Sequence, residues 1–301
     1  MLTITLVACL AVLTLPILRP DGGRRLPLRI VVAEPELRGD EAGLRRRELL
    51  LEALRDGLER QLSGRRGLAA ARLFVPAAEA AATARELGAD EVLSARVAAS
   101  AQGLRIGLGR RRTIDGQLVW QRDQIHLADG DLRRIDRQLA DELKRAYIRY
   151  PRPLEAVRLF AEAADYEAYL RLRIESREAA DPALLAPRFA ALRSGSPRFF
   201  EAYLWPARAI AATPRPGAAA AAEALDLLDH AGRIAPQDPR PAEAAFRLLL
   251  ELGRREEAAS RLAELERLRP GDPDLFSWRS LLDQSSAGAA ARPSGDRKPA
   301  P

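Results

Sequence analysis

The sequence predicts a multi-domain protein in which a small mixed-sheet α/β domain is followed by an all-α solenoid of helical hairpins. Up to about residue 149, segments with apolar residues at every second position alternate with segments of helical periodicity, which is typical of an α/β domain. The rest of the chain shows helical periodicity only, and two of its segments are related by an offset of 34 residues. The 301 residues are enough for two domains with cores of their own.

An uncharged, apolar segment opens the chain: residues 2–18 read LTITLVACLAVLTLPIL, and Arg19 follows. This run is slightly shorter than the roughly 20 apolar residues that usually cross a bilayer. It lacks a preceding basic region and a clear cleavage site, unlike a secretory signal peptide. We therefore expect residues 1–18 to be a membrane anchor or an uncleaved signal in a single-pass inner-membrane protein. Periplasmic soluble domains are expected, although Arg19, Arg24 and Arg25 favour the opposite orientation under the positive-inside rule.

The single cysteine allows one further interpretation of this segment. Leu6-Val7-Ala8-Cys9 matches a lipoprotein cleavage box, in which Cys9 would be acylated. Only eight residues precede Cys9, none of them basic, and the apolar run continues beyond it, so lipidation is the less favoured alternative. With one cysteine in the chain, neither an intramolecular disulfide nor a cysteine-based metal cluster is possible.

The α/β domain is expected over residues 26–149. Residues 26–34 predict a strand with apolar residues on both faces, which is typical of a buried central strand. Residues 51–62 predict a helix with one apolar stripe, ended by glycines, and residues 71–75 predict a short strand. A second helix is expected to end at Leu87-Gly88.

Three further strands and a helix complete this domain. Alternating apolar residues at 93–97 and 104–108 predict two strands, and a third follows Asp115-Gly116, which predicts a two-residue hairpin turn. Apolar residues at helical spacing over 132–147 predict a closing helix, capped by Asp129 or Asp131. The expected order is β-α-β-α-β-β-β-α.

Two motifs within this order carry a family resemblance. RELGADEVL at residues 85–93 and DGQLVW at residues 115–120 make residues 28–148 resemble the TolB-N-terminal-like or FlgO-like domain. The resemblance implies a domain that precedes tetratricopeptide repeats in membrane-tethered regulators, often distal to a class III nucleotide cyclase, a Ser/Thr kinase or a winged-helix domain. The loop after the first strand, Ala33-Glu34-Pro35-Glu36, departs from the apolar-Pro-Phe-polar pattern of that family.

Helical repeats are expected over residues 153–284. EALDLLDHAGRIAPQDP, from Glu223, aligns with EAASRLAELERLRPGDP, from Glu257, at an offset of 34 residues, which is the tetratricopeptide period. The sequence thus predicts a tetratricopeptide-like α-solenoid, with Phe276 and Trp278 capping it and a disordered tail at 285–301. The residues expected to define the repeat structurally are Ala224, Leu228, Pro236, Gly253, Ala258, Leu262 and Pro270.

The first helices of such repeats line a concave groove, and this groove is the expected binding surface. By the repeat alignment, the residues facing it are Arg240, Glu243, Arg247 and Leu250. The alternative, that these residues are ordinary solvated surface, is equally open at this stage.

Catalytic chemistry is not expected. The only histidines, His126 and His230, stand apart from other metal-ligating residues, and no nucleophile, phosphate-loop or zinc-binding motif occurs. We therefore predict no metal, no cofactor and no small-molecule substrate. The formal charge is +6, but arginines are interleaved with acidic residues, as in Arg254-Arg255-Glu256-Glu257, so nucleic-acid binding is not expected either.

These observations favour a membrane-anchored, non-catalytic scaffold or sensor that binds a protein or peptide partner through its helical repeats. The alternative is a regulatory C-terminal module of a signalling cyclase or kinase whose catalytic domain is absent from this chain. A third hypothesis is an outer-membrane lipoprotein, which would require acylation of Cys9.

Overall fold

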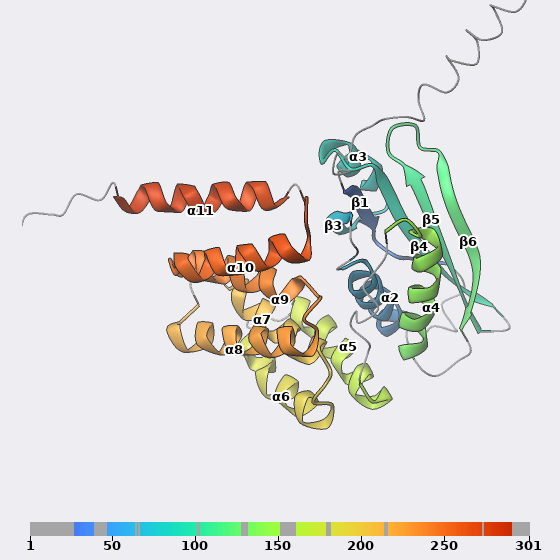
Figure 1. Ribbon diagram of the computed structural model, residues 1–301. Helices are drawn as coiled ribbons and strands as arrows, with labels where there is room; N and C mark the ends of the chain where they lie inside the picture. The colour runs from blue at the N-terminus through green and yellow to red at the C-terminus, as the bar shows by residue number, and fades with distance from the viewer. Residues whose placement is uncertain are drawn as a thin grey trace, which may run out of the picture.

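The computed structural model describes residues 27–38, 47–63, 65, 67–100, 103–127, 132–150, 161–178, 182–213, 216–272 and 274–290. These residues form a mixed β-sheet with helices on both faces and, beside it, an array of helices (Figure 1). The predicted anchor at residues 1–18 with Cys9, and the last part of the predicted tail, lie outside the described residues. Within the described residues, no helix has the length and apolar character needed to cross a bilayer.

The sheet has the strand order β3-β1-β4-β5-β6. The two strands that flank β1 both run parallel to it, whereas β4, β5 and β6 form an antiparallel meander. A short strand, β2, pairs in parallel with β4 where the sequence predicted only a loop. The strands are β1 (Leu28–Ala33), β2 (Glu36–Arg38), β3 (Leu68–Val75), β4 (Glu91–Ser100), β5 (Gly103–Arg112) and β6 (Leu118–Leu127).

Helices cover the two faces of the sheet unequally. Helices α2 (Arg47–Leu62) and α4 (Arg133–Ala146) pack on one face, over residues such as Ile30 and Leu93. The short helix α3 (Ala80–Glu86) packs on the other face, against Val31 and Val75. Helices α2 and α4 pack closely at Gly57, because a Cβ atom there would lie 2.7 Å from Cδ1 of the buried Leu139.

The β5–β6 turn differs from the prediction, whereas the predicted cap of the closing helix stays a prediction. The β5–β6 connection is longer than the predicted two-residue turn, because β5 ends at Arg112 and β6 begins only at Leu118. Gly116 has the positive φ (+67°) expected of it, and the Gln117 N–H donates to Asp115 Oδ1 at 3.0 Å within this longer loop. The predicted helix caps Asp129 and Asp131 lie outside the described residues.

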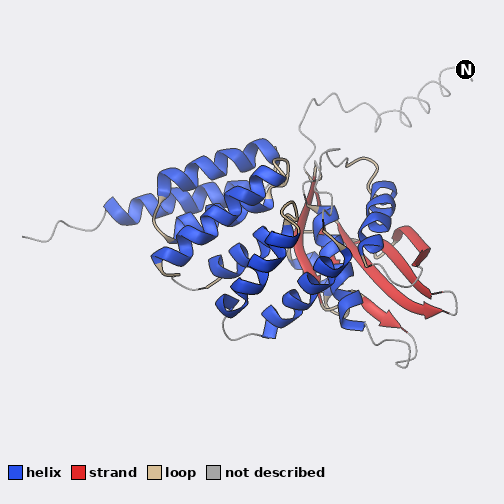
Figure 2. Ribbon diagram, turned by 90° about the horizontal axis from the view of Figure 1, so that it is seen from below, coloured by secondary structure: helices blue, strands red, loops and turns tan. Residues whose placement is uncertain are grey.

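The helical array consists of α5 (Ala163–Glu178), a 3₁₀ turn η2 (Pro182–Leu185), α6 (Ala186–Gly195), α7 (Glu201–Ala211), α8 (Ala218–Ile234), α9 (Arg240–Glu251), α10 (Arg255–Leu268) and α11 (Asp274–Ala290). Helices that follow each other in the chain pack together, and α7 also packs against α9. In Figure 2 this array lies beside the sheet. The last helix, α11, extends to Ala290, beyond the expected end of the array at residue 284.

The residues that define the 34-residue repeat occupy matching places in the array. Ala224 and Leu228 of α8 are buried in one apolar core, and Ala258 and Leu262 of α10 are buried in the next. Gly253 has a φ of +71° in the turn between α9 and α10, a conformation that glycine adopts without strain. The two prolines of the repeat, Pro236 and Pro270, are exposed in the turns after α8 and α10.

The expected separation into two domains with independent cores is wrong for the first helices of the array. One continuous apolar core contains Leu54 of α2 and Ile135 of α4 together with Tyr169 of α5, Phe189 of α6 and Phe199. These aromatic residues of the first helices therefore pack against the α/β domain. Only the later helices have separate cores.

Candidate binding cleft

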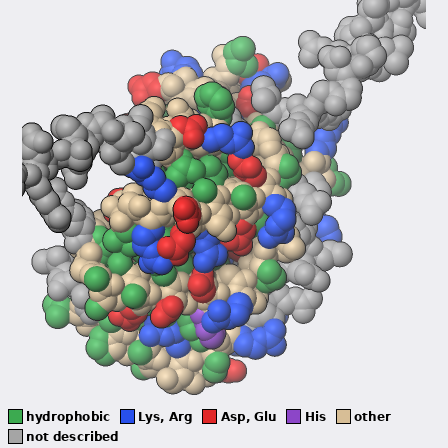
Figure 3. Space-filling model, turned by 60° about the vertical axis from the view of Figure 1, so that its left-hand side comes forward, with side chains coloured by type: hydrophobic (Ala, Val, Ile, Leu, Met, Phe, Trp, Pro, Cys, Tyr) green, Lys and Arg blue, Asp and Glu red, His purple; other side chains and the backbone are tan. Residues whose placement is uncertain are grey.

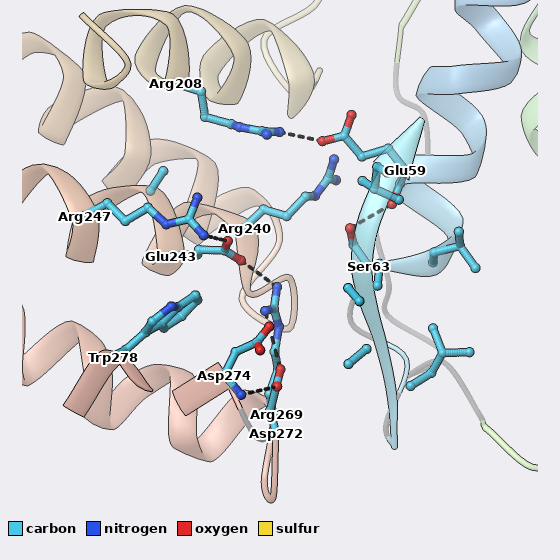
Figure 4. A pocket seen from close by; sticks show the side chains of 17 residues that line it. Glu59, Ser63, Arg208, Arg240, Glu243, Arg247, Arg269, Asp272, Asp274 and Trp278 are labelled. Carbon is cyan, nitrogen blue, oxygen red and sulfur yellow. Dashed lines mark hydrogen bonds and ion pairs between the residues drawn. The ribbon is translucent and has the colours of Figure 1, made fainter. Parts of the chain in front are cut away.

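A cleft of about 230 Å³ separates the α/β domain from the helical array (Figure 4). One wall consists of β3 and the end of α2, including Glu59 and Ser63. The other wall consists of α7, α9 and the start of α11, including Arg208 and Trp278. Both parts of the chain thus contribute to the same concave surface.

The cleft follows the free edge of β3. Residues 68–71 all line it, although consecutive residues of a strand point to opposite faces of a sheet. A cleft that touches four consecutive residues must therefore lie along the strand edge. Among the described strands, β3 pairs with β1 only. An edge strand presents backbone N–H and C=O groups that are free to pair with another chain, and Ala69, Ala70 and Ala71 leave room for one.

Ion pairs line the cleft, and in two of them the arginine is much more exposed than the carboxylate. Arg247 pairs with Glu243 at 2.8 Å, and their side chains are 61% and 21% exposed. Arg208 pairs with Glu59, and the corresponding values are 40% and 7%. Arg269 also reaches Glu243 at 2.8 Å, as the dashed lines in Figure 4 show. Asp274, which also lines the cleft, is instead more exposed (43%) than its partner Arg29 (31%). The cleft therefore presents the guanidinium groups of Arg208 and Arg247 to a ligand, together with one acidic side chain at the start of α11.

Trp278 provides an aromatic surface beside these charges. Its ring stacks on Phe246 with the centroids 5.6 Å apart, and the Arg247 guanidinium carbon lies 5.4 Å from its centroid. Trp278 therefore packs on the last core, as expected of a capping residue, and lines the cleft as well. Phe276 is 78% exposed and does not line the cleft.

Of the four residues predicted to face the groove, three line the cleft and one does not. Glu243 and Arg247 lie on the wall of the cleft. Arg240 also lines it but is only 7% exposed, because its guanidinium is held by Glu201 and Asp238, each at 2.9 Å. Burial alone would lower the pKa of Arg240, but Asp238 and Glu201 outweigh it and raise the pKa. Leu250 does not line the cleft; it packs, partly buried, against the last core.

A buried network of charged and phenolic groups fixes the two walls relative to each other. Asp56 of α2 accepts hydrogen bonds from the hydroxyls of Tyr166 (2.9 Å) and Tyr169 (2.8 Å) and from Arg173 (2.7 Å), all three on α5. Arg60 of α2 pairs with Asp56 at 2.6 Å and reaches Glu201 of α7 at 3.6 Å. All six of these side chains take part in contacts that join α2 to the array.

Glu59 links this network to the cleft. Burial alone would raise the pKa of Glu59, but Arg208, Arg173 and Arg240 outweigh it and lower the pKa to about 2. Glu59 is thus a stable anion that binds α2 to α5 and α7. Because these pairs join α2 to α5 and to α7, they fix the two walls of the cleft relative to each other.

Sequence reasoning missed the side chains of this network on α2. Glu52, Asp56 and Glu59 follow helical spacing and resemble the solvated face of a surface helix. A signal was nevertheless present, because Tyr166, Tyr169 and Arg173 form a complementary polar stripe of the same spacing on α5.

The two histidines occupy unrelated places. The ring of His230 stacks on Tyr203 with centroids 4.2 Å apart, and burial, followed by Arg233, lowers its pKa. His126 lies in β6 opposite Arg105 of β5. Within the described part of the chain, no group of three or more His, Cys, Asp or Glu side chains could hold a metal ion.

On the face seen in Figure 3, acidic and basic side chains are interspersed.

No protein-family model matches the sequence. Comparison with curated proteins gives no match either. Among solved structures, the chain is similar to a PelC dodecamer from Paraburkholderia phytofirmans, with 17% sequence identity and a TM-score of 0.27. The similarity covers 41% of this chain and 91% of that chain. At this TM-score it carries no argument about fold or function.

Proposed function

We propose that the protein is a non-catalytic scaffold or sensor whose cleft binds an extended, acidic segment of a partner protein. The observation that carries this proposal is the position of the cleft, between the free edge of β3 and a wall on which the guanidinium groups of Arg208 and Arg247 are exposed. An extended segment can add to a sheet edge through main-chain hydrogen bonds, while its side chains enter neighbouring pockets.

The charges of the cleft set the chemistry of the partner. Arg247 and Arg208 are more exposed than the carboxylates that they contact, so an acidic side chain of the ligand meets guanidinium groups first. Hydrogen bonds between guanidinium and carboxylate groups are stronger than neutral ones. Trp278 offers a flat apolar surface to a neighbouring residue of the ligand.

The buried network adds preorganisation. Because Asp56, Glu59 and Arg60 already fix α2 against the array, the two walls lose little further freedom when a ligand binds. A rigid cleft of this kind suits a protein whose task is to present a binding surface.

We also propose that the array is a tetratricopeptide-like solenoid and that residues 28–148 form a TolB-N-terminal-like or FlgO-like domain. The 34-residue offset supports the first proposal, as do Asp238 and Asp272, which each accept a hydrogen bond at 3.0 Å from the backbone N–H two residues further on. The strand and helix order supports the second. We further propose that residues 2–18 anchor the chain in an inner membrane, with its soluble domains in the periplasm.

The proposal is tested by selecting peptides from a random display library on the immobilised full chain in detergent. We expect the selected peptides to be rich in acidic and β-branched residues and poor in proline, because proline cannot pair fully with a strand edge. Arg247→Glu should abolish the acidic enrichment, because it reverses the charge that faces the ligand.

Arg267→Glu is the matched control. It makes the same change of charge at an exposed position of α10 that does not line the cleft, and it should leave the selection unchanged. Enrichment of basic peptides, or an equal effect of the two substitutions, would contradict the proposal.

A further inference from the structure

The start of β1 and the β5–β6 loop lie at the same end of the sheet. The strand register pairs Ile30 of β1 with Glu91 of β4, and Glu91 with Arg112, the last residue of β5. Figure 1 shows the β5–β6 loop beside the point where the described chain begins. Residues 1–26 therefore join the folded part at this end.

Exposed apolar side chains gather at this end. Ile114, in the β5–β6 loop, is 87% exposed, and Leu118 and Val119, at the start of β6, are 41% and 46% exposed. Ile148, which is 78% exposed, follows α4, whose last residue Ala146 accepts a hydrogen bond from Arg110 of β5. Single exposed apolar residues are ordinary on a protein surface, but a group of four at one end is not.

Basic side chains surround these apolar residues. Arg111 and Arg112 directly precede the β5–β6 loop and are both exposed. Arg145 is 62% exposed near the end of α4, and Arg149 is exposed beside Ile148. Two acidic residues offset part of this charge: Asp115 pairs with Arg112 at 3.3 Å, and Glu142 pairs with Arg145. An apolar tip within a basic ring has the pattern that binds the interface of an anionic bilayer.

We propose that this end of the α/β domain is a second membrane contact, in which Ile114, Leu118 and Val119 enter the headgroup region of an anionic phospholipid bilayer. The inference rests on the proposed anchoring by residues 2–18. Only residues 19–26 separate that segment from the first described residue, and eight residues span at most roughly 30 Å. The tether thus keeps this end close to the bilayer surface.

Contact with an anionic bilayer also accounts for exposed arginines that lie outside the cleft. Arg111 and Arg112 are too exposed to stabilise the fold appreciably, and neither lines the cleft. Near an anionic surface, each arginine strengthens binding on the order of fivefold. A lipid partner therefore accounts for the apolar and the basic residues together.

The test uses the full chain with Cys9→Ser, so that an environment-sensitive fluorophore can be attached to a single cysteine introduced by Ile114→Cys. The protein is reconstituted into phosphatidylcholine vesicles with or without phosphatidylglycerol, and nitroxide-labelled lipid serves as the quencher. We expect quenching at position 114, stronger in the vesicles that contain phosphatidylglycerol. The control is Leu184→Cys, because Leu184 is similarly exposed (76%) but lies in η2, between α5 and α6.

Each outcome bears on the proposal. The double substitution Arg111→Gln and Arg112→Gln should lower the equilibrium constant for contact between the β5–β6 loop and anionic vesicles by about 20-fold. If the protein floats with the vesicles but position 114 is quenched no more than position 184, the contact is refuted and the anchor remains. If the protein does not float, both proposals fail. Equal quenching in neutral and anionic vesicles would refute the role of the arginines.

Discussion

Asp56→Ala is the substitution that most directly perturbs the connection between the α/β domain and the array. Asp56 is 1% exposed and lies at the centre of the buried network. It accepts hydrogen bonds from Tyr166 (2.9 Å), Tyr169 (2.8 Å) and Arg173 (2.7 Å), and it pairs with Arg60 at 2.6 Å. Alanine removes all four interactions and leaves a small cavity among groups that cannot reach water.

The expected loss of stability follows from the partners that remain. Breaking a buried ion pair by removing one partner costs about 3–5 kcal/mol, because the other charge is left buried and uncompensated. Arg60 retains Asp136 at 3.0 Å, and Arg173 retains Glu52 and Glu59, which limits the loss. The two tyrosine hydroxyls lose their acceptor, which costs about 1 kcal/mol or more each. We therefore expect the free energy of unfolding to fall by about 3–5 kcal/mol, since these terms are not additive.

The assay is urea denaturation followed by circular dichroism, at a pH near 7. Asp229→Ala is the matched control: Asp229 also pairs with an arginine, Arg261, but its side chain is 44% exposed, and such a pair contributes at most about 0.5 kcal/mol. A loss below about 1 kcal/mol for Asp56→Ala would refute the reasoning, since it would mean that the network does not hold the two parts together.

Three further predictions concern stability. The folded-state pKa of Glu59 is about 2, below its ordinary value, so its contribution of about 3 kcal/mol to the free energy of unfolding should be complete above pH 5 and lost as the pH falls towards 2. The stability of Glu59→Gln should depend less on acid pH, and identical acid titrations of the two proteins would contradict this prediction. Ala258→Glu should lower the melting temperature strongly, because Ala258 is 0% exposed between α9 and α10, whereas Ala259→Glu, at the exposed neighbouring position, should change it little. Gly253→Ala should lower the free energy of unfolding by about 1 kcal/mol in denaturant titration, because the φ of Gly253 is +71°. Gly232→Ala, inside α8 with free space around it, should raise the free energy of unfolding by up to about 1 kcal/mol, and equal effects of the two substitutions would overturn the argument from backbone conformation.

Residue periodicity predicted the order of the main elements of the α/β domain, because each of them has one apolar face over several turns or strand positions. It did not predict β2, which has three residues and a single apolar one, Leu37. It also predicted the β5–β6 turn too short: Asp115-Gly116 sets the positive φ at Gly116, but it does not fix how many residues precede and follow it.

The independence of the two domains was predicted wrongly for a physical reason. Tyr166 and Tyr169 fall within the range predicted for the helical repeats, yet their hydroxyls bind Asp56, more than 100 residues earlier in the chain. Local spacing identifies a polar stripe, but it does not reveal which distant stripe complements it. The charged face of α2 was therefore indistinguishable from a solvated one.

The candidate site was predicted in part. The repeat alignment placed Arg240, Glu243 and Arg247 on a common surface, and they do line the cleft. The alignment could not reveal that Arg240 is held by Glu201, that Leu250 turns towards the last core, or that β3 forms the opposite wall. These features depend on how the array docks onto the sheet, and that docking rests on the long-range network.

Amide hydrogen exchange in β3 tests the proposed mode of binding most directly, measured on the full chain with and without an acidic peptide selected by its cleft. If the peptide adds as a strand, the edge amides within residues 68–75 should exchange more slowly in the complex, and Arg247→Glu should remove the effect. Protection confined to the outer helices α8 and α10, with β3 unchanged, would contradict the account.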